Sequence, residues 1–388
     1  MSNIDKKLTF SDFSEADREA WKQKIIADLK GKDYEESLVW QTKEGFDVQP
    51  FYDASYIGET EKNLSAIQNS LLNTENPDFG YRYWYNTQKI EADDLETANR
   101  IALDALENGA EGLLFYLPAP LSTDNLATLL KDVQLDFCSV SFHLKGLPEK
   151  LLTNYLAYIK ANNFDTKKVT GELLCQFSET DEATLADIFK GLQALPQFKL
   201  QLSVGATEVS YSEETADLLA EAVKLVETLG SKGISASDVL KQLSIGIHLR
   251  NNYFFEIARL RALRFLFTEM VNQYGVGFQA KDLHVSTTTS IEISEETKED
   301  PYLNMLSNTG QAMAGIIGGC NGLTILPHNE GIEQSDAFST HIARNISNIL
   351  KEEAYFDKVA DPAAGSYYLE HLTAQLAAKS WELFQELV

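Results

Sequence analysis

The chain has 388 residues, of which 44% are hydrophobic and 10% aromatic, enough apolar side chains to bury a large core. Its formal net charge of −25 at pH 7 argues against nucleic acid or an anionic membrane as a partner, because both would repel the chain. No signal-like segment begins the sequence, no apolar run reaches about 18 residues, and the three cysteines lie far apart. We therefore expect a cytoplasmic protein with free thiols.

Residues 1–75 differ from the rest of the sequence. The stretch 21–30, WKQKIIADLK, predicts a short amphipathic helix that ends at Gly31. The stretch 38–52, LVWQTKEGFDVQPFY, is typical of an extended chain with interruptions at glycine and proline. Because 1–75 has little periodic structure, we interpret it as an arm that wraps another surface, and we assign 76–388 to the folded domain.

From about residue 80, short apolar runs alternate with longer helical patterns. In 92–110, 212–230 and 254–275, apolar residues recur at spacings of three and four. The predicted strands are 81–85, 112–117, 136–143, 169–175, 199–204, 243–249, 282–287 and 322–326. Eight strands that alternate with helices predict an α/β fold, a (β/α)₈ TIM barrel. The main alternative is an open doubly wound sheet, but no strand is followed by G-x-G-x-x-G.

Alternation within the strands predicts which side chains face the barrel axis. In 138–144, 200–205, 243–249 and 282–287, one face is apolar and should pack under the helices, which leaves the polar face for the lumen. The predicted lumen residues are Ser139, Ser141, His143, Gln201, Ser203, Ser244, Gly246, His248, His284 and Ser286. The second and fourth strands give no clear facing. Two interpretations remain open: a lumen that admits an extended polar ligand or water, and a filled core whose polar side chains bond one another.

The sequence offers no self-sufficient catalytic set. His143, His248 and His284 near strand ends could indicate a metal-dependent hydrolase, but H-x-H on the first strand and an aspartate on the last are missing. The stretch 282–287, DLHVST, has the D-x-H spacing of a cobalt-ligating D-x-H-x-x-G loop, but Thr287 replaces the glycine. We predict no catalytic, cofactor-binding or metal-ligating residue on this chain.

The C-terminal part of the sequence carries its most specific motifs. The stretches 301–331 (PYLNMLSNTGQAMAGIIGGCNGLTILPHNEG) and 338–373, together with 29–52 and 251–264 (NNYFFEIARLRALR), resemble the methylmalonyl-CoA mutase family. The resemblance covers nearly the whole chain. It implies a barrel whose polar lumen is threaded by the pantetheine chain of an acyl-CoA substrate. It also implies a holoenzyme that interconverts methylmalonyl-CoA and succinyl-CoA with adenosylcobalamin.

Residues that catalytic members of this family use are replaced here. Where they carry T-I-R-Q-Y-A-G-F, the stretch 81–88 reads YRYWYNTQ and cannot be matched residue by residue. Where they carry G-Y-H, 206–208 reads ATE, and an ionised glutamate would repel a developing oxyanion. On the seventh strand, similar to F-H-x-Q-T-[AS]-G, His284 matches, while Ser286 and Thr289 replace the glutamine and glycine. These losses resemble those of the family's small, non-catalytic subunit.

The resemblance thus implies the small subunit of a heterodimeric mutase that pairs with a large catalytic subunit, or with itself when alone. Adenosylcobalamin would be bound by the partner, and none is expected on this chain, which shows no cobalamin-binding domain after the barrel. The alternative is a catalytically competent acyl-CoA mutase barrel that takes cobalamin from a separate chain. In a third, weaker possibility, the lumen keeps a vestigial or allosteric site for coenzyme A.

Overall fold

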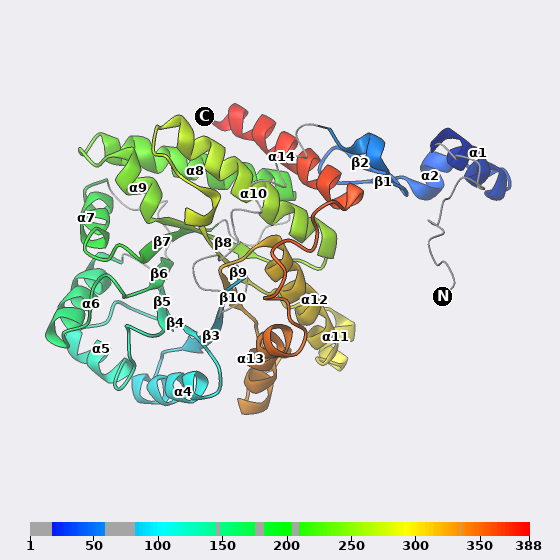
Figure 1. Cartoon of the computed structure of the whole chain (residues 1–388). Helices are drawn as coiled ribbons and strands as arrows, with labels where there is room; N and C mark the ends of the chain where they lie inside the picture. The colour runs from blue at the N-terminus through cyan, green and yellow to red at the C-terminus, as the bar shows by residue number, and fades with distance from the viewer. Residues whose placement is uncertain (1–17, 59–81, 145–147, 175–181, 204–208, 334) are drawn as a thin grey trace, which may run out of the picture. The chain divides into compact units, whose positions relative to one another are not determined.

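The computed structural model describes residues 18–58, 82–144, 148–174, 182–203, 209–333 and 335–388 (Figure 1). The chain divides into two compact units, 1–52 and 53–388. The first unit holds α1 (Arg18–Asp28), α2 (Tyr34–Leu38), and a small antiparallel sheet of β1 (Trp40–Gln41) and β2 (Asp47–Val48). The helix predicted at 21–30 is confirmed as α1. The assignment of 1–75 to an arm stays a prediction.

The second unit contains a closed barrel of eight parallel strands in the order β10-β3-β4-β5-β6-β7-β8-β9, all of them in described residues. The strands are β3 (Tyr85–Glu91), β4 (Gly112–Leu117), β5 (Ser139–Leu144), β6 (Gly171–Leu174), β7 (Phe198–Leu202), β8 (Leu243–His248), β9 (His284–Thr288) and β10 (Gly322–Thr324). The predicted TIM barrel is confirmed.

Helices surround the barrel and cover the apolar side of its strands (Figure 1). They are α4 (Leu95–Glu107), α5 (Thr123–Leu129), α6 (Glu149–Ala161), α7 (Glu182–Leu192), α8 (Tyr211–Gly230), α9 (Ala236–Gln242), α10 (Tyr253–Gln273), α11 (Glu295–Glu299), α12 (Leu303–Gly318), α13 (Ala337–Glu352) and α14 (Tyr367–Leu387). The short 3₁₀ helices are η1 (Ala54–Tyr56) and η3 (Ala280–Asp282). None of the helices in the described part of the chain has the length and apolar character needed to span a bilayer.

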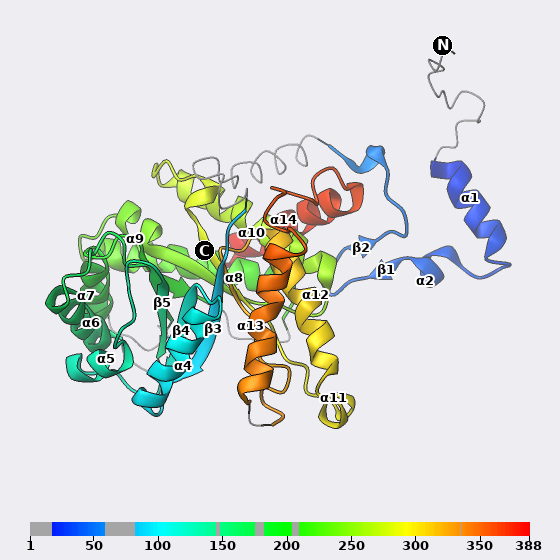
Figure 2. The ribbon, with the colours of Figure 1, turned by 60° about the horizontal axis from the view of Figure 1, so that its bottom comes forward.

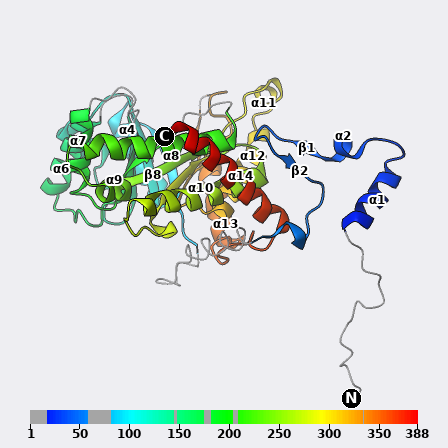
Figure 3. The ribbon, with the colours of Figure 1, turned by 90° about the horizontal axis from the view of Figure 1, so that it is seen from above.

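Local sequence signals set the helix ends. At the start of α8, the Ser210 hydroxyl accepts a hydrogen bond from the Glu213 backbone N–H, while the Glu213 carboxylate accepts one from Ser210 N–H. This reciprocal cap satisfies two backbone donors that the helix itself leaves unpaired. The last helix, α14, packs against α8 and α10 (Figure 3), and α13 lies between β3 and α12, which contacts β10 (Figure 2).

The first strand lies later in the chain than predicted. The expected strand 81–85 is wrong apart from Tyr85, where β3 begins. Trp84 is instead buried before the strand, and its indole N–H donates to the Ser347 hydroxyl on α13 at 2.9 Å. β3 itself reads YNTQKIE, and even its helix-facing side carries the buried polar residue Asn86. An alternation of apolar and polar residues was therefore never present to reveal it.

Candidate functional site

A polar cavity of about 90 Å³ lies on the barrel axis. The predicted lumen residues that line it are Ser139, Ser141, His143, Gln201, Ser203, Gly246, His248, His284 and Ser286. Ser244, the remaining predicted lumen residue, pairs with Gln201 and His284 in the register, but it is completely buried and does not line the cavity. The structure thus brings most of the predicted residues together around one small space.

Strands whose facing the sequence left open supply further lining. β4 contributes Leu114 and Tyr116, and β6 contributes Glu172 and Leu174. The other additional lining residues are Tyr85, Thr87, Ile247, Thr288, Gly322 and Thr324. Of these, Glu172 matters most for the chemistry, because it brings a carboxylate into the lumen. A single charged residue inside the otherwise apolar run 171–174 (GELL) was the signal that could have identified it.

Glu172 is held by residues of two other strands, its sheet neighbour β5 and the more distant β9. Its backbone N–H donates to the Ser141 hydroxyl on β5 at 3.0 Å, and its Oε2 accepts a hydrogen bond from the Ser286 hydroxyl on β9. The residue is only 7% exposed. Its other oxygen, Oε1, has no hydrogen-bond partner among the described residues. Gly171, just before it, has φ of +147°, and a Cβ there would lie 1.9 Å from the Val140 carbonyl oxygen.

The histidine of the stretch 282–287, which has the D-x-H spacing, lines the same cavity as this carboxylate. Burial lowers the pKa of His284, although the charge of Glu172 acts in the opposite direction. The ring of His284 lies 6.5 Å from that of Tyr85, centroid to centroid. Asp282 is outside the strand, in η3, where its carboxylate accepts a hydrogen bond from the Gln279 backbone N–H at 2.8 Å.

Glycines allow polar side chains to fill much of the lumen. A Cβ at Gly246 would lie 2.2 Å from Oε1 of Gln201, so the bare backbone of β8 is what gives the glutamine amide its space. In the same way, a Cβ at Gly322 would lie 2.9 Å from the Ser286 hydroxyl. The lumen is therefore largely occupied by its own side chains, and the small cavity is the space that they leave.

A larger cavity, of about 850 Å³, opens at the amino-terminal ends of the strands. Its rim includes Lys199, Lys241 and Lys281. It shares Tyr85, Ser139, Glu172 and His284 with the small cavity, so these side chains separate the two spaces. Lys199, the register neighbour of Glu172, directs its ammonium to the Lys241 carbonyl oxygen at 2.6 Å.

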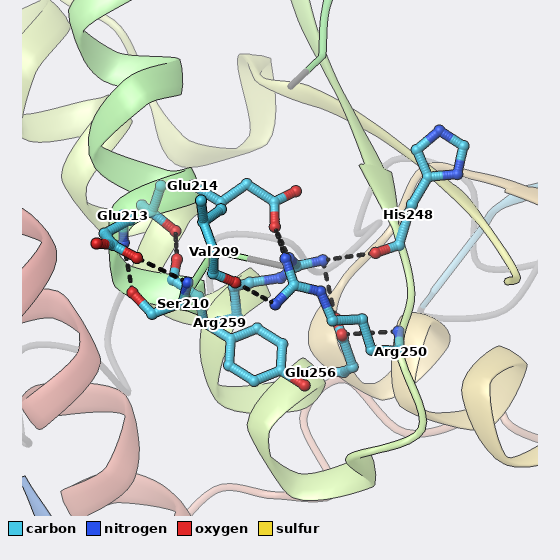
Figure 4. Close-up of polar contacts among 10 residues, drawn as sticks. Val209, Ser210, Glu213, Glu214, His248, Arg250, Glu256 and Arg259 are labelled. Carbon is cyan, nitrogen blue, oxygen red and sulfur yellow. Dashed lines mark hydrogen bonds and ion pairs between the residues drawn. The ribbon is translucent and has the colours of Figure 1, made fainter. Parts of the chain in front are cut away.

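A buried ionic network lies at the carboxyl end of β8 (Figure 4). Glu214 of α8 accepts hydrogen bonds from both Arg250 and Arg259, the latter at 2.7 Å. Arg259 also donates to the His248 carbonyl oxygen at 3.0 Å, while the imidazole of His248 points away from the network (Figure 4). Glu256 accepts from the Arg250 backbone N–H at 2.8 Å. Desolvation raises the pKa of Glu256 to about 7, despite the opposing charge of Arg259.

Comparison with known proteins matches this chain to one family. A family model described as methylmalonyl-CoA mutase matches residues 203–388. The methylmalonyl-CoA mutase small subunit of Porphyromonas gingivalis is 32% identical over 397 residues, which cover 98% of this chain and 64% of that protein. The small subunits of Streptomyces virginiae and Propionibacterium freudenreichii subsp. shermanii are 27% and 26% identical, each over 97% of this chain and over 64% and 62% of their own lengths.

The chain belongs to the methylmalonyl-CoA mutase family. It spans less than two thirds of the length of these small subunits. Among solved structures, the catalytic domain of a chitinase from Pyrococcus furiosus aligns with a TM-score of 0.41 and 10% identity, over 70% of this chain and 98% of that one. That likeness says nothing about function.

The family's motif positions have plain structural surroundings here. Thr289, in place of the motif glycine, is fully buried, and its hydroxyl accepts a hydrogen bond from the Leu326 backbone N–H at 2.9 Å. The stretch 206–208 lies outside the described residues. In the described part of the chain, no group of three or more His, Cys, Asp or Glu side chains could hold a metal ion. The arginines of the family-like stretch 251–264 are buried structural residues.

Proposed function

We propose that this chain is the small, structural subunit of a heterodimeric, adenosylcobalamin-dependent methylmalonyl-CoA mutase. In this proposal a large catalytic subunit interconverts methylmalonyl-CoA and succinyl-CoA. The observation that carries the proposal is the filled barrel axis, where Glu172 and Ser286 meet between the two cavities. The relatives whose names say "small subunit" cover nearly all of this chain, which supports the same assignment.

The lumen is poorly suited to an acyl-CoA thread. A cavity of about 90 Å³ can hold several water molecules. Pockets for organic ligands run from about 300 to 1,000 Å³. A pantetheine chain would have to displace Gln201 and break the contact between Glu172 and Ser286. This argues for the interpretation of a filled polar core, and against both catalysis in this barrel and a vestigial site for coenzyme A.

The described residues also fit cobalamin poorly. A corrin ring with histidine as its lower ligand needs an imidazole that reaches an open surface. His284 instead lies inside the barrel, on the wall of a cavity far smaller than a corrin. We therefore assign the cofactor, which supplies the radical chemistry, to the partner subunit.

The first unit offers surface for pairing with another chain. No residue of α1 is buried, and Trp40 and Phe51 are exposed by 47% and 39%. Exposed aromatic side chains of this kind are enriched where proteins associate. The proposal therefore assigns the first unit to the interface with the large subunit. This is the role expected of an arm that wraps another surface.

Co-expression with the large subunit of the same organism tests the proposal. We expect a one-to-one complex by light scattering after gel filtration, and mutase activity in that complex only. The isolated chain, mixed with adenosylcobalamin and a separate cobalamin-binding domain, should produce no succinyl-CoA. Failure to form the complex at any ratio would remove the basis of the proposal, and a homodimer alone would point to another role.

The alternative function is a catalytic mutase barrel that takes cobalamin from a separate chain. It predicts turnover in the absence of the large subunit. It also predicts that coenzyme A binds the isolated chain, which calorimetry can measure directly. Our proposal predicts neither signal, so the two functions are distinguished by the same purified samples.

A further inference from the structure

The small cavity has a carboxylate group in its wall. Glu172 lines it, and the described residues of its wall include no lysine or arginine. Lys199, the nearest candidate in the strand register, makes its hydrogen bonds to carbonyl oxygens of Lys241 and Pro196. Burial lowers the pKa of His284, which disfavours a charged imidazole beside the carboxylate. A buried carboxylate without a counter-charge is strongly unfavourable, so this site calls for a cation.

The unpaired oxygen of Glu172 is the second observation. Oε1 is buried and has no hydrogen-bond partner among the described residues, whereas Oε2 is satisfied by Ser286. Buried polar atoms normally have partners. A ligand beside Oε1 would meet a wall rich in hydroxyl groups. Those hydroxyls belong to Thr87, Ser139, Ser141, Ser203, Ser286, Thr288 and Thr324.

We propose that this cavity binds one monovalent cation of the size of potassium or ammonium, held by the Glu172 carboxylate and surrounding hydroxyl oxygens. Oxygen ligands of this kind suit hard cations. The space of about 90 Å³ admits such an ion with a few waters. A transition metal is disfavoured, because the described residues contain no group of three suitable side chains. The larger cavity below, which shares Glu172, gives a route from the solvent.

This cation would be structural. It would neutralise Glu172 and connect β6 with β5 and β9, the strands that supply Ser141 and Ser286. The inference concerns the isolated chain and does not depend on the proposed pairing with a large subunit.

Thermal unfolding of the full chain tests the site. Samples in potassium, ammonium, lithium and N-methylglucamine chloride at equal ionic strength are compared over a range of salt concentrations. Potassium or ammonium should raise the melting temperature by about 3–5 °C over the concentration range, with a shift that grows as the logarithm of the salt concentration above the dissociation constant, because a ligand that binds only the folded state stabilises it. N-methylglucamine is too large for the cavity and should give no such shift.

Two variants and one direct measurement decide the outcome. Glu172→Gln keeps the shape but removes the charge, and should abolish the cation-specific shift. Glu299→Gln, an exposed position in α11, should keep it. Crystals grown with rubidium should show anomalous density beside Glu172, which settles the matter even if the Glu172 variant does not fold. Equal melting temperatures in all salts, an unchanged shift in Glu172→Gln, or water alone in the cavity would each overturn the proposal.

Discussion

Glu256 is predicted to make the stability of the barrel depend on pH. It is completely buried, and its partners are Arg250 and Arg259, with Glu214 adding a like charge from α8. Replacing it with glutamine keeps the shape of the side chain. The glutamine oxygen can still accept the hydrogen bond from the Arg250 backbone N–H, which measures 2.8 Å in the wild type. The replacement removes the ionisable group. The network in Figure 4 is therefore preserved in shape while its titration is lost.

The magnitude follows from the change in pKa. Burial raises the pKa of Glu256 from 4.5 to about 7, which corresponds to about 3 kcal/mol at roughly 1.4 kcal/mol per tenfold change in affinity for the proton. Because the folded state holds the proton more tightly, this contribution is fully present below pH 4.5 and is lost as the pH rises to about 7. Between pH 4.5 and about 7, the free energy of unfolding of the wild type should therefore fall by about 3 kcal/mol relative to that of Glu256→Gln. Above this interval the difference should stay constant.

Urea unfolding of both proteins at a series of pH values from about 5 to about 8 measures this difference. Glu299→Gln, at an exposed position, serves as the control for a general loss of negative charge. The free energy of unfolding of Glu256→Gln should rise relative to that of the wild type as the pH increases, and the difference should then level off. A gap that stays constant, or one that narrows as the pH rises, would show that Glu256 is not held neutral by burial.

Three further substitutions, one of them with a matched control, test the packing. Gly171→Ala should cost more than about 4 kcal/mol in urea unfolding, because its Cβ would lie 1.9 Å from the Val140 carbonyl oxygen at φ +147°. Gly230→Ala, where the space is open, should be neutral or slightly stabilising. Arg264→Lys keeps the charge but cannot reach all four acceptor oxygens, so a loss of at least about 2 kcal/mol is expected by the same method. Trp84→Phe removes a buried N–H donor, and calorimetry should show a loss of about 1–2 kcal/mol; unchanged stability would contradict its buried role.

Strands marked by a continuous apolar run or by apolar-polar alternation could be located from the sequence. The apolar run 112–117 coincides with β4, and the alternating stretch 243–249 differs from β8 only at its last residue. β3 could not be found, because both of its faces are polar and the preceding aromatic residues imitate a strand. Whether the strand lies at 81–85 or at 85–91 depends on packing against residues distant in the sequence, and a local pattern contains no information about that packing.

The candidate site shows the same limit. Alternation placed Ser141, His284 and Ser286 on the lumen side, where the structure has them. It could not place Glu172, because 171–174 has no alternation and the facing of β6 is set by its neighbours. The sequence also could not predict how much of the lumen is filled by side chains. That depends on Gln201 extending over Gly246, a contact between strands that are separate in the sequence.

Arg264 has a consequence for how the chain can fold. Its guanidinium donates to carbonyl oxygens of Ala280 and Leu283, just before β9, and to Gly319 and the Asn321 side chain, just before β10. In a nascent chain that ends before residue 319, the Arg264 guanidinium would lack half of its hydrogen-bond acceptors. Its position is fully buried in the folded protein. We therefore expect the barrel to close only after the last strand has been synthesised. Fragments that lack it should be captured by chaperones instead of accumulating as folded half-barrels.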